Sequence, residues 1–335
     1  MRRMSVRALV VGTGYAGQRH ADALRELGVA FEGPLSARDV AGDLSPITGR
    51  SGQVVHVCAA NDLHARLVAA ALAADNDVVC EKPLATDVAT AEDLAAQAET
   101  SGRLAVLGYG YRFHPMAVEL VDRARSRELG EIHDLRGAFL QDWLLLASDE
   151  NWRVDPVRGG ASRVIADIGA HWLDLAELVT GRTVESVVAH VGRLHGRATE
   201  DHASLLARFA GGLVGSCALS QASAGHRNDL ELSVDAAGGS LTWRYERADE
   251  IVVATRGGTR TITRGGDHAS ARARRLAERP AGPNEGRRNL LAAVYAKLDG
   301  SADAPLPTFR DGVRHLRFAA AAIESARRRA WVDLA

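Results

Sequence analysis

Three residues in the middle of the chain have types and a spacing suited to proton transfer. Asp167, His171 and Asp174 stand at positions i, i+4 and i+7, which in a helix of about 3.6 residues per turn would share one narrow stripe. Histidine can accept or donate a proton near neutral pH, because its unperturbed pKa is about 6.5. A lone helical histidine is more often structural. A separate apolar stripe could anchor the helix: Ile168, Trp172, Leu175 and Val179.

A second candidate is the charged pair that follows a short apolar run in NDVVCEKPLATD, residues 76–87. Open α/β sheets place their chemistry at the carboxyl ends of parallel strands. The Lys82 ammonium could hydrogen-bond a reacting hydroxyl, stabilise developing negative charge and lower the pKa of a nearby imidazole. Pro83 restrains the turn, and Glu81 could salt-bridge or orient Lys82. An exposed charge pair in a surface turn is the alternative interpretation.

The segment VVGTGYAGQRH, residues 10–20, carries the pattern G-x-G-x-x-G between an apolar run and a helical pattern. Glycines there allow a tight turn and close approach of the backbone to a pyrophosphate, which lies at the helix N-terminus. The pattern alone is weak, but its position at the first strand strengthens it. The predicted cofactor-binding residues of this loop are Gly12, Gly14, Tyr15, Ala16 and Gly17.

An acidic residue follows the next apolar run. Glu32 lies 20 positions after Gly12, where a carboxylate that binds the ribose hydroxyls of NAD is expected. Glu32 therefore favours NAD as the cofactor. NADP stays possible, because Arg38 is near enough to bind a 2′-phosphate.

The order of predicted strands and helices along the chain predicts an α/β protein of two domains. Over residues 1–112, short apolar strands alternate with amphipathic helices, which is typical of a Rossmann dinucleotide-binding domain. Over residues 113–335, successive strands with glycine-containing turns predict an α+β domain with a large, open, mainly antiparallel sheet. Helices are predicted near 285–298 and 311–328, and a mobile loop over the Arg- and Gly-rich stretch 256–283.

Composition excludes several classes of protein. With 41 Lys and Arg against 42 Asp and Glu, the net charge of −1 gives no field to attract nucleic acid or an anionic membrane. No apolar run approaches the roughly 20 residues of a membrane span, and the basic start is too short in its apolar part for a signal peptide. Three scattered cysteines indicate reduced thiols and a cytoplasmic location. Without a Cys/His cluster of ligand spacing, no metal is expected.

Several separated motifs together resemble the Gfo/Idh/MocA oxidoreductases, the glucose-fructose oxidoreductase and inositol dehydrogenase family. They are the glycine loop with His20, NDLH at 61–64, EKP at 81–83, GYGYRFHP at 108–115 and GGASRVIADIGAHWLDLAELVTG at 159–181. The resemblance implies that Lys82, Asp167 and His171 are catalytic, with His171 exchanging the hydroxyl proton. It also implies that Lys82 and His171 converge on one substrate carbon beside the nicotinamide, and that Asp174 orients His171 or joins a local network.

Further contacts are predicted around these residues. Asn61, His64 and Glu81 are expected to contact the cofactor, although Asn61 could instead be a helix N-cap. Tyr109, Arg112 and Asp174 are expected to bind substrate, although Arg112 could equally form an interdomain ion pair. Aromatic and arginine side chains on the segment 141–160 could stack on a sugar or bind it through hydrogen bonds: Trp143, Trp152 and Arg153.

The resemblance predicts a nicotinamide-dependent dehydrogenase or ketoreductase acting on a ring hydroxyl or ketone of a sugar, sugar nucleotide or cyclitol. An aminosugar-type biosynthetic pathway is compatible with this prediction. The alternatives are an NAD-dependent glycosidase of the same family and a non-catalytic, dinucleotide-sensing regulatory protein. A homodimer or homotetramer is expected by analogy.

The sequence also departs from the family pattern at two places. Only 21 residues separate Glu32 from Val54, so the first domain is expected to lack a strand. Pro283 stands where many relatives carry a histidine beside the substrate.

Overall fold

The computed structural model describes residues 6–302 and 305–334, which form two compact units. The first unit comprises the described residues up to Gly110, with Val157–Ala161 and Gly282–Leu316. The second comprises Tyr111–Pro156, Ser162–Ala281 and the described residues from Arg317 onward. The first boundary lies two residues from the one expected. However, the chain returns twice to the first unit, so that 282–316 belongs there rather than to the second.

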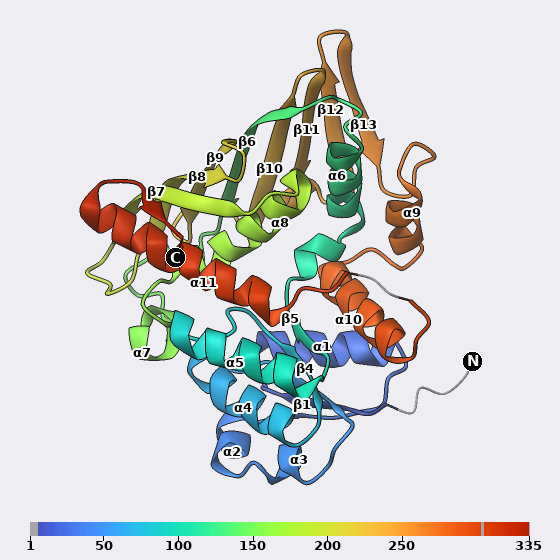
Figure 1. The fold of residues 1–335 in the computed structure, drawn as a ribbon, viewed down its shortest axis with the longest axis vertical. Helices are drawn as coiled ribbons and strands as arrows, with labels where there is room; N and C mark the ends of the chain where they lie inside the picture. The colour runs from blue at the N-terminus through green and yellow to red at the C-terminus, as the bar shows by residue number, and fades with distance from the viewer. Residues whose placement is uncertain (1–5, 303–304, 335) are drawn as a thin grey trace. The chain divides into compact units, whose positions relative to one another are not determined.

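The first unit is built on a parallel sheet whose strands alternate with helices, as predicted (Figure 1). Its strands run in the order β2-β1-β3-β4-β5. The strands are β1 (Ala8–Val11), β2 (Phe31–Leu35), β3 (Val54–Val57), β4 (Asp77–Cys80) and β5 (Ala105–Leu107). The main helices are α1 (Tyr15–Glu26), α4 (Asn61–Ala73), α5 (Val88–Ser101) and the late α10 (Glu285–Leu298), which packs on α1. β1 and β3 are buried throughout, as expected of parallel strands covered by helices.

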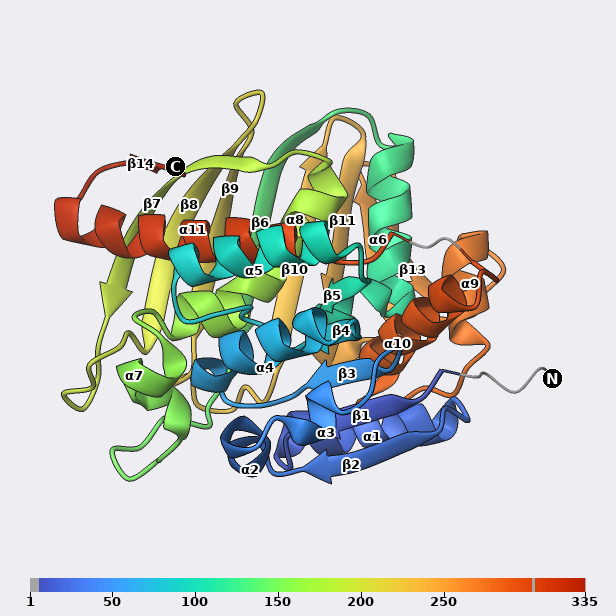
Figure 2. The same cartoon turned by 60° about the horizontal axis from the view of Figure 1, so that its bottom comes forward.

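This sheet lacks one strand, which confirms the prediction of a trimmed domain. The classic order 3-2-1-4-5-6 places a further strand outside β2. Here the segment between β2 and β3 holds only α2 (Ala37–Gly42) and α3 (Ser45–Thr48). β2 is therefore an edge strand, as Figure 2 shows. It tolerates Pro34 because an edge position does not require its missing N–H.

The second unit is built on a nine-stranded sheet in the order β13-β12-β11-β10-β6-β9-β8-β7-β14. Only the β6–β9 pairing is parallel, so the sheet is mainly antiparallel, as predicted. Its strands are β6 (Ile132–Leu140), β7 (Val184–Gly192), β8 (His202–Phe209), β9 (Val214–Ser220), β10 (Asp229–Ala236), β11 (Gly239–Arg244), β12 (Glu250–Thr255), β13 (Gly258–Thr263) and β14 (Val332–Asp333).

Helices cover one face of the large sheet. α6 (Pro115–Ser126) and α8 (Ala170–Thr180) lie over its central and outer strands (Figure 1), and the second half of α11 (Phe309–Arg328) packs into the same core. Strand β8 shows the consequence, because Leu205 and Phe209 are buried while Leu206 and Arg208 on the opposite face are exposed. Such alternation is typical of an antiparallel sheet with one covered face.

The prediction of a loop over 256–283 is wrong. The segment contains β13 and the helix α9 (Ala271–Ala277). Ile262 and Ala273 are buried, and Ser270 caps α9 by accepting a hydrogen bond from the Ala273 N–H. The Ser270 N–H donates to Glu119 on α6 at 2.6 Å. These tertiary contacts order a stretch whose composition resembles that of a loop.

The three cysteines are buried free thiols. Burial raises the pKa of Cys58, Cys80 and Cys217 well above the ordinary value, so these thiols are core groups and not reactive ones. Among the described residues, no helix has both the length and the apolar character that a membrane span requires.

Candidate active site

The glycine loop forms an open cradle at the N-terminus of α1. A side chain at Gly12, whose φ is 127°, would overlap the Cys58 carbonyl, and one at Gly17 would overlap the Gly12 carbonyl. Gly14 instead faces open space and is the N-cap of α1, with no side chain capping the helix. The first N–H groups of the helix, including those of Tyr15 and Ala16, therefore suit an anion. This cradle fits the pyrophosphate of a dinucleotide.

The structure corrects the ribose contact predicted for Glu32. Glu32 pairs with Leu9 in the β1–β2 register, whereas the Gly12 N–H bonds to the Leu35 carbonyl at 2.8 Å. At about 3.3 Å per residue, Glu32 lies roughly 10 Å before the strand end that faces the glycine loop. Its carboxylate accepts a hydrogen bond from Arg50 at 3.1 Å. Sequence spacing misplaced Glu32 because β2 begins at Phe31 instead of ending there.

Different residues follow the end of β2. Ser36 caps α2, its Oγ lying 3.4 Å from the Asp39 nitrogen, and Arg38 is exposed in the first turn of α2. Because the carboxylate of Glu32 is distant from the glycine loop, Glu32 does not favour NAD over NADP. Arg38 and Asp39 are the charged residues of the first turn of α2, just beyond the strand end, and of the two side chains the Arg38 guanidinium suits a 2′-phosphate.

Lys82 emerges from the same edge of the sheet as the glycine loop. Hydrogen bonds join successive strand ends, from Cys58 N–H to the Val11 carbonyl at 2.7 Å and from Glu81 N–H to the Val57 carbonyl at 2.9 Å. The Gly108 N–H likewise donates to the Cys80 carbonyl at 2.8 Å. The sequence prediction that Lys82 follows a strand at the carboxyl edge of the sheet is therefore confirmed.

Glu81, expected from the sequence to contact the cofactor, belongs to a buried polar cluster. Its Oε1 lies 3.1 Å from His20 Nε2 and 3.2 Å from Arg287 Nε. His20 Nδ1 lies 2.8 Å from His56 Nδ1, and His56 Nε2 lies 2.8 Å from the Tyr295 hydroxyl. Neither His56 nor Arg287 stands out in the sequence, because they come together only when β3 and α10 meet β4.

His64 and Asn61 also hold the backbone in place. His64 is fully buried, with Nδ1 2.8 Å from the Pro83 carbonyl and Nε2 3.1 Å from the Ala59 carbonyl. Asn61 is not the N-cap of α4, which is Ala60, and donates to the Gly159 carbonyl at 2.8 Å. These contacts favour a supporting role for both side chains over the direct cofactor contacts expected from the sequence.

The buried histidines predict loss of stability in acid. Burial lowers the pKa of His20 and lowers that of His56 well below 6.5. The unfolded chain therefore binds more protons below about pH 6.5, and the free energy of unfolding should fall as pH drops, by up to about 1.4 kcal/mol per pH unit for each histidine. Urea unfolding followed by circular dichroism from about pH 5 to 7.5 measures this slope. His56→Asn should make the slope shallower, and an unchanged slope would contradict the prediction.

In the second unit, the segment carrying Asp167 and His171 is not a regular α-helix. A π-helical turn, η3 (Ile165–Gly169), precedes α8, and the Ala170 N–H bonds to the Ile165 carbonyl. This turn rotates the side chains that follow it about the helix axis. Asp167, His171 and Asp174 therefore lie in three different environments and not on one stripe. π-Helical turns are frequent at functional sites. The apolar stripe is confirmed by the buried side chains of Ile168, Trp172, Leu175 and Val179.

Each polar residue of the expected stripe has its own surroundings. Asp167 accepts a hydrogen bond from Gln221 Nε2 at 2.7 Å, and Arg153 Nε lies 3.5 Å from the same carboxylate. The His171 ring meets the Tyr111 ring edge-on at 4.8 Å between centroids. Asp174 follows the second of its two expected roles, a local network, because its two oxygens accept hydrogen bonds from Arg112. Arg112 thus forms an ion pair, but within the second unit and not between the units.

A path of amide side chains connects the surroundings of Asp167 and His171. Gln221 Nε2 lies 3.4 Å from Gln141 Oε1, and Gln141 Nε2 donates to Asn228 Oδ1 at 2.8 Å. Asn228 in turn donates to the Tyr111 hydroxyl at 2.5 Å. Gln221 and Asn228 come from strand ends that sequence patterns could not bring together. Amides can donate to and accept from hydroxyl groups, so this path suits a polyhydroxylated ligand.

Three predicted substrate residues do gather beside Asp167. The Arg153 guanidinium lies 4.4 Å from the centroid of the Trp152 ring and 6.0 Å from that of Trp143. Trp143 Nε1 donates to Gln141 at 2.7 Å. Tyr109, by contrast, is only 1% exposed in the first unit, and its hydroxyl lies 2.6 Å from His315 Nδ1. This burial favours a structural role for Tyr109 over the predicted contact with substrate.

A buried ion-pair network supports the start of the π-helical turn. Glu200 accepts hydrogen bonds from the Arg163 and Ile165 N–H groups at 2.9 and 3.2 Å. The Arg163 guanidinium bonds to Asp201 and, at 2.9 Å, to Gln221. Arg163 therefore fixes the amide that holds Asp167. The sequence offers no signal for this network, since its members are separated by up to 58 residues.

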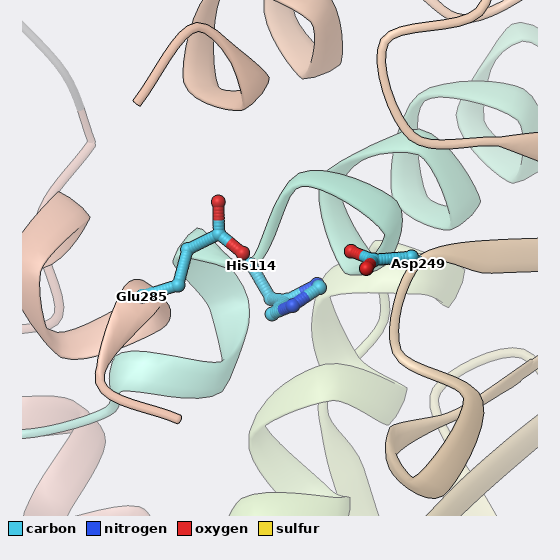
Figure 3. A group of neighbouring side chains, drawn as sticks. All are labelled: His114, Asp249 and Glu285. Carbon is cyan, nitrogen blue, oxygen red and sulfur yellow. The ribbon is translucent and has the colours of Figure 1, made fainter. Parts of the chain in front are cut away.

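No metal site is inferred from the acidic and histidine groups among the described residues. His226 and Asp229 lie 2.8 Å apart, but the Arg244 guanidinium bonds both Asp229 oxygens and occupies the positions that a cation would need. Figure 3 shows His114 and Asp249 of the second unit, together with Glu285, which belongs to the first. These three residues do not form a cluster within either unit.

Parts of both domains match models of known protein families. The model of the oxidoreductase family with an NAD-binding Rossmann fold matches residues 43–109, and the model of the GFO/IDH/MocA C-terminal domain matches residues 118–242. The levoglucosan dehydrogenase of Pseudarthrobacter phenanthrenivorans is 27% identical over 316 residues, which cover 84% of this chain and 80% of that enzyme.

Solved structures extend the similarity to the whole chain. An inositol dehydrogenase homologue from Azotobacter vinelandii, complexed with NAD+, has a TM-score of 0.86 at 25% identity and covers 99% of this chain and 98% of its own. A levoglucosan dehydrogenase complexed with NADH and L-sorbose also has a TM-score of 0.86 at 25% identity, with coverage of 98% and 99%. The chain belongs to the Gfo/Idh/MocA family and is an oxidoreductase with an NAD-binding Rossmann fold.

Proposed function

We propose that this chain is a dehydrogenase or ketoreductase acting on a ring hydroxyl or ketone of a sugar or cyclitol. In the oxidative direction, His171 takes the hydroxyl proton while a hydride leaves the carbinol carbon for the nicotinamide, which is the chemistry that the cofactor supplies when bound. Lys82 stabilises negative charge on the reacting oxygen, and Asp167 accepts a hydrogen bond from a substrate hydroxyl. In reduction, His171 returns the proton.

The observation that carries the proposal is the amide path from Asp167 through Gln221, Gln141 and Asn228 to Tyr111, beside His171. Several hydroxyls can be bound there at once, which would hold a ring in one orientation. The aromatic and guanidinium groups beside Asp167 add a surface on which a sugar ring can stack. The named relatives act on levoglucosan and inositol, which are compounds of this class.

Composition also supports a specific role for Lys82. The chain contains 41 Lys and Arg residues, and only Lys82 and Lys297 are lysines. Arginine is therefore the usual cation of this sequence. A lysine at position 82 supplies a compact ammonium on a flexible stem, which a planar guanidinium cannot provide.

The proposal is tested with purified protein, NAD or NADP and a panel of sugars, sugar nucleotides and inositols, while nicotinamide absorbance is followed. Net reduction or oxidation of the cofactor with a panel member supports it. Cleavage of a glycoside without net turnover would replace it with a glycosidase. Tight binding of the dinucleotide without either reaction would replace it with a sensor.

The cofactor preference is predicted to depend on Arg38. If Arg38 binds the 2′-phosphate, Arg38→Gln should weaken NADPH binding by roughly tenfold or more, since charge-assisted hydrogen bonds to phosphate contribute about 1.5–3 kcal/mol. NADH binding should not change. Quenching of tryptophan fluorescence or calorimetry measures both dissociation constants. Arg50→Gln, which removes the partner of Glu32, is the control and should alter neither. Equal losses for both dinucleotides would contradict the role of Arg38.

Two further expectations accompany the proposal. The exposed face of the large sheet, which includes Leu206 and Arg208 on β8, supports assembly into a homodimer or homotetramer, and sedimentation velocity measures the mass of the assembly. Three buried free thiols support a reducing, cytoplasmic location.

A further inference from the structure

The Glu81 carboxylate is a meeting point for three distant segments. It is 7% exposed, and its Oε1 receives His20 from α1 at 3.1 Å and Arg287 from α10 at 3.2 Å. The Glu81 backbone N–H donates to the Val57 carbonyl at the end of β3. A buried carboxylate is costly unless it is paired and hydrogen-bonded, and here it is both.

The hydrogen bonds behind Glu81 have a fixed direction. An ionised Glu81 can only accept, so His20 donates through Nε2 and, as a neutral ring, accepts at Nδ1. His56 must then donate from Nδ1 to His20 and accept at Nε2 from the Tyr295 hydroxyl. Tyr295, His56, His20 and Glu81 thus form one chain in which every donor faces an acceptor.

The charge states of these side chains agree with the direction of the hydrogen bonds, from Tyr295 to Glu81. Burial alone would raise the pKa of Glu81, but Arg287 and the hydrogen bond from His20 outweigh it and hold the pKa well below its usual value. Burial lowers the pKa of both His20 and His56 and raises that of Tyr295. Arg287 is therefore the cation that bonds the Glu81 carboxylate, and the other members of the hydrogen-bonded chain, His20, His56 and Tyr295, are neutral.

The cluster also fixes the turn that carries the lysine. A Cβ on Gly108 would lie 3.0 Å from the carboxyl carbon of Glu81, so the side chain of Glu81 fills the space that glycine leaves open. Lys82 is the next residue, and the Pro83 carbonyl beyond it is 2.8 Å from His64 Nδ1. The turn cannot shift without breaking buried hydrogen bonds on both sides of Lys82.

We propose that Glu81 is a positioning residue for Lys82, held in place by Arg287 and by the directed chain from Tyr295 through His56 and His20. The proposal rests on the proposed function for its catalytic consequence. It assigns a role in the reaction to α10, a helix more than 200 residues from the lysine in sequence, because α10 supplies both Arg287 and Tyr295.

A double-mutant cycle tests the catalytic consequence. Glu81→Gln keeps the shape of the side chain but removes its charge, and should lower kcat by roughly ten- to a hundredfold through misplacement of Lys82. If Glu81 acts through Lys82, the same change in a Lys82→Met background should cause no further loss. If Glu81→Gln lowers kcat by the same factor in the Lys82→Met background as in the unmodified protein, the proposal is overturned. Dissociation constants for NADH, measured by fluorescence, should stay unchanged throughout.

A second pair of variants separates this role from general stability. Arg287→Gln removes the cation that holds Glu81, whereas Arg288→Gln alters the next residue of α10, which pairs with Glu26. Arg287→Gln should lower kcat as Glu81→Gln does, and Arg288→Gln should not. If kcat falls equally in both variants, in proportion to their loss of thermal stability, the proposal is overturned.

A spectroscopic measurement is independent of any turnover. Protein labelled with 13C at the Cε atom of lysine gives two signals, from Lys82 and Lys297, because the chain has only these lysines. Glu81→Gln and Arg287→Gln should each shift the Lys82 signal and leave that of Lys297 in place. An unmoved Lys82 signal would overturn the positioning role even if no substrate is found. A shifted signal with no turnover on any substrate would leave positioning supported and the proposed function rejected.

Discussion

Replacing His171 by asparagine should reduce kcat by roughly a hundredfold or more, the usual size of a general base's contribution. Asparagine retains a polar side chain but cannot take a proton at neutral pH. His171 lies at the start of α8, and the centroid of its ring lies 4.8 Å from that of Tyr111 and 6.2 Å from that of Phe139, so aromatic contacts fix its orientation. The affinity for NADH should stay the same, because the glycine cradle belongs to the first unit.

The measurement is the dependence of kcat on pH for His171→Asn and the unmodified protein with the substrate found in the panel. The variant should lack the ionisation that controls oxidation in the unmodified protein. The same substitution at His268, an exposed residue in the turn before α9, is the matched control and should have no effect. Retention of full activity and of the pH profile in His171→Asn would show that another group is the base.

Replacing Lys82 by methionine should lower kcat by about 10²–10³-fold, as loss of one group that stabilises a developing oxyanion does. Methionine preserves an unbranched, flexible stem while removing the charge. Lys82→Arg should not restore activity, since a guanidinium is larger, planar and differently hydrated. Because Lys82 follows β4 at the edge that also carries the glycine loop, the loss should appear in kcat more than in binding of the dinucleotide.

Single-turnover kinetics with saturating NAD separates the chemical step from product release. Lys297→Met removes the other lysine, which is exposed near the end of α10, and should behave as the unmodified protein does. If Lys82→Met slows only product release, or if Lys297→Met causes an equal loss, Lys82 does not stabilise the reacting oxygen.

Several features follow from the sequence alone. The alternation of strands and helices, the glycine loop and the shortened segment after Glu32 predict a Rossmann domain lacking a strand, and the structure confirms each of them. These signals are local, because the turn chemistry of glycine and the periodicity of apolar residues act over a few neighbouring positions. For the same reason, the apolar run ahead of Lys82 is enough to place this lysine at a strand end.

The local periodicity of the sequence does not predict a feature that depends on a shift of a few residues along a helix or strand. The ideal 3.6-residue repeat places Asp167, His171 and Asp174 on one stripe, but the π-helical turn gives them different partners. The spacing from Gly12 places Glu32 at the end of a strand that in fact begins beside it. A strand boundary depends on pairing with β1, and a π-helical turn depends on distant groups such as Glu200 that bond to its N–H groups.

The sequence thus determined which residue types could do chemistry and the fold class that carries them. Tertiary structure alone decided their partners: Arg287 and His20 for Glu81, Gln221 for Asp167, and Arg112 for Asp174. Such partners are separated by tens to hundreds of residues, and a buried charge selects them by desolvation and hydrogen-bond geometry. Neither quantity leaves a pattern in the neighbouring sequence.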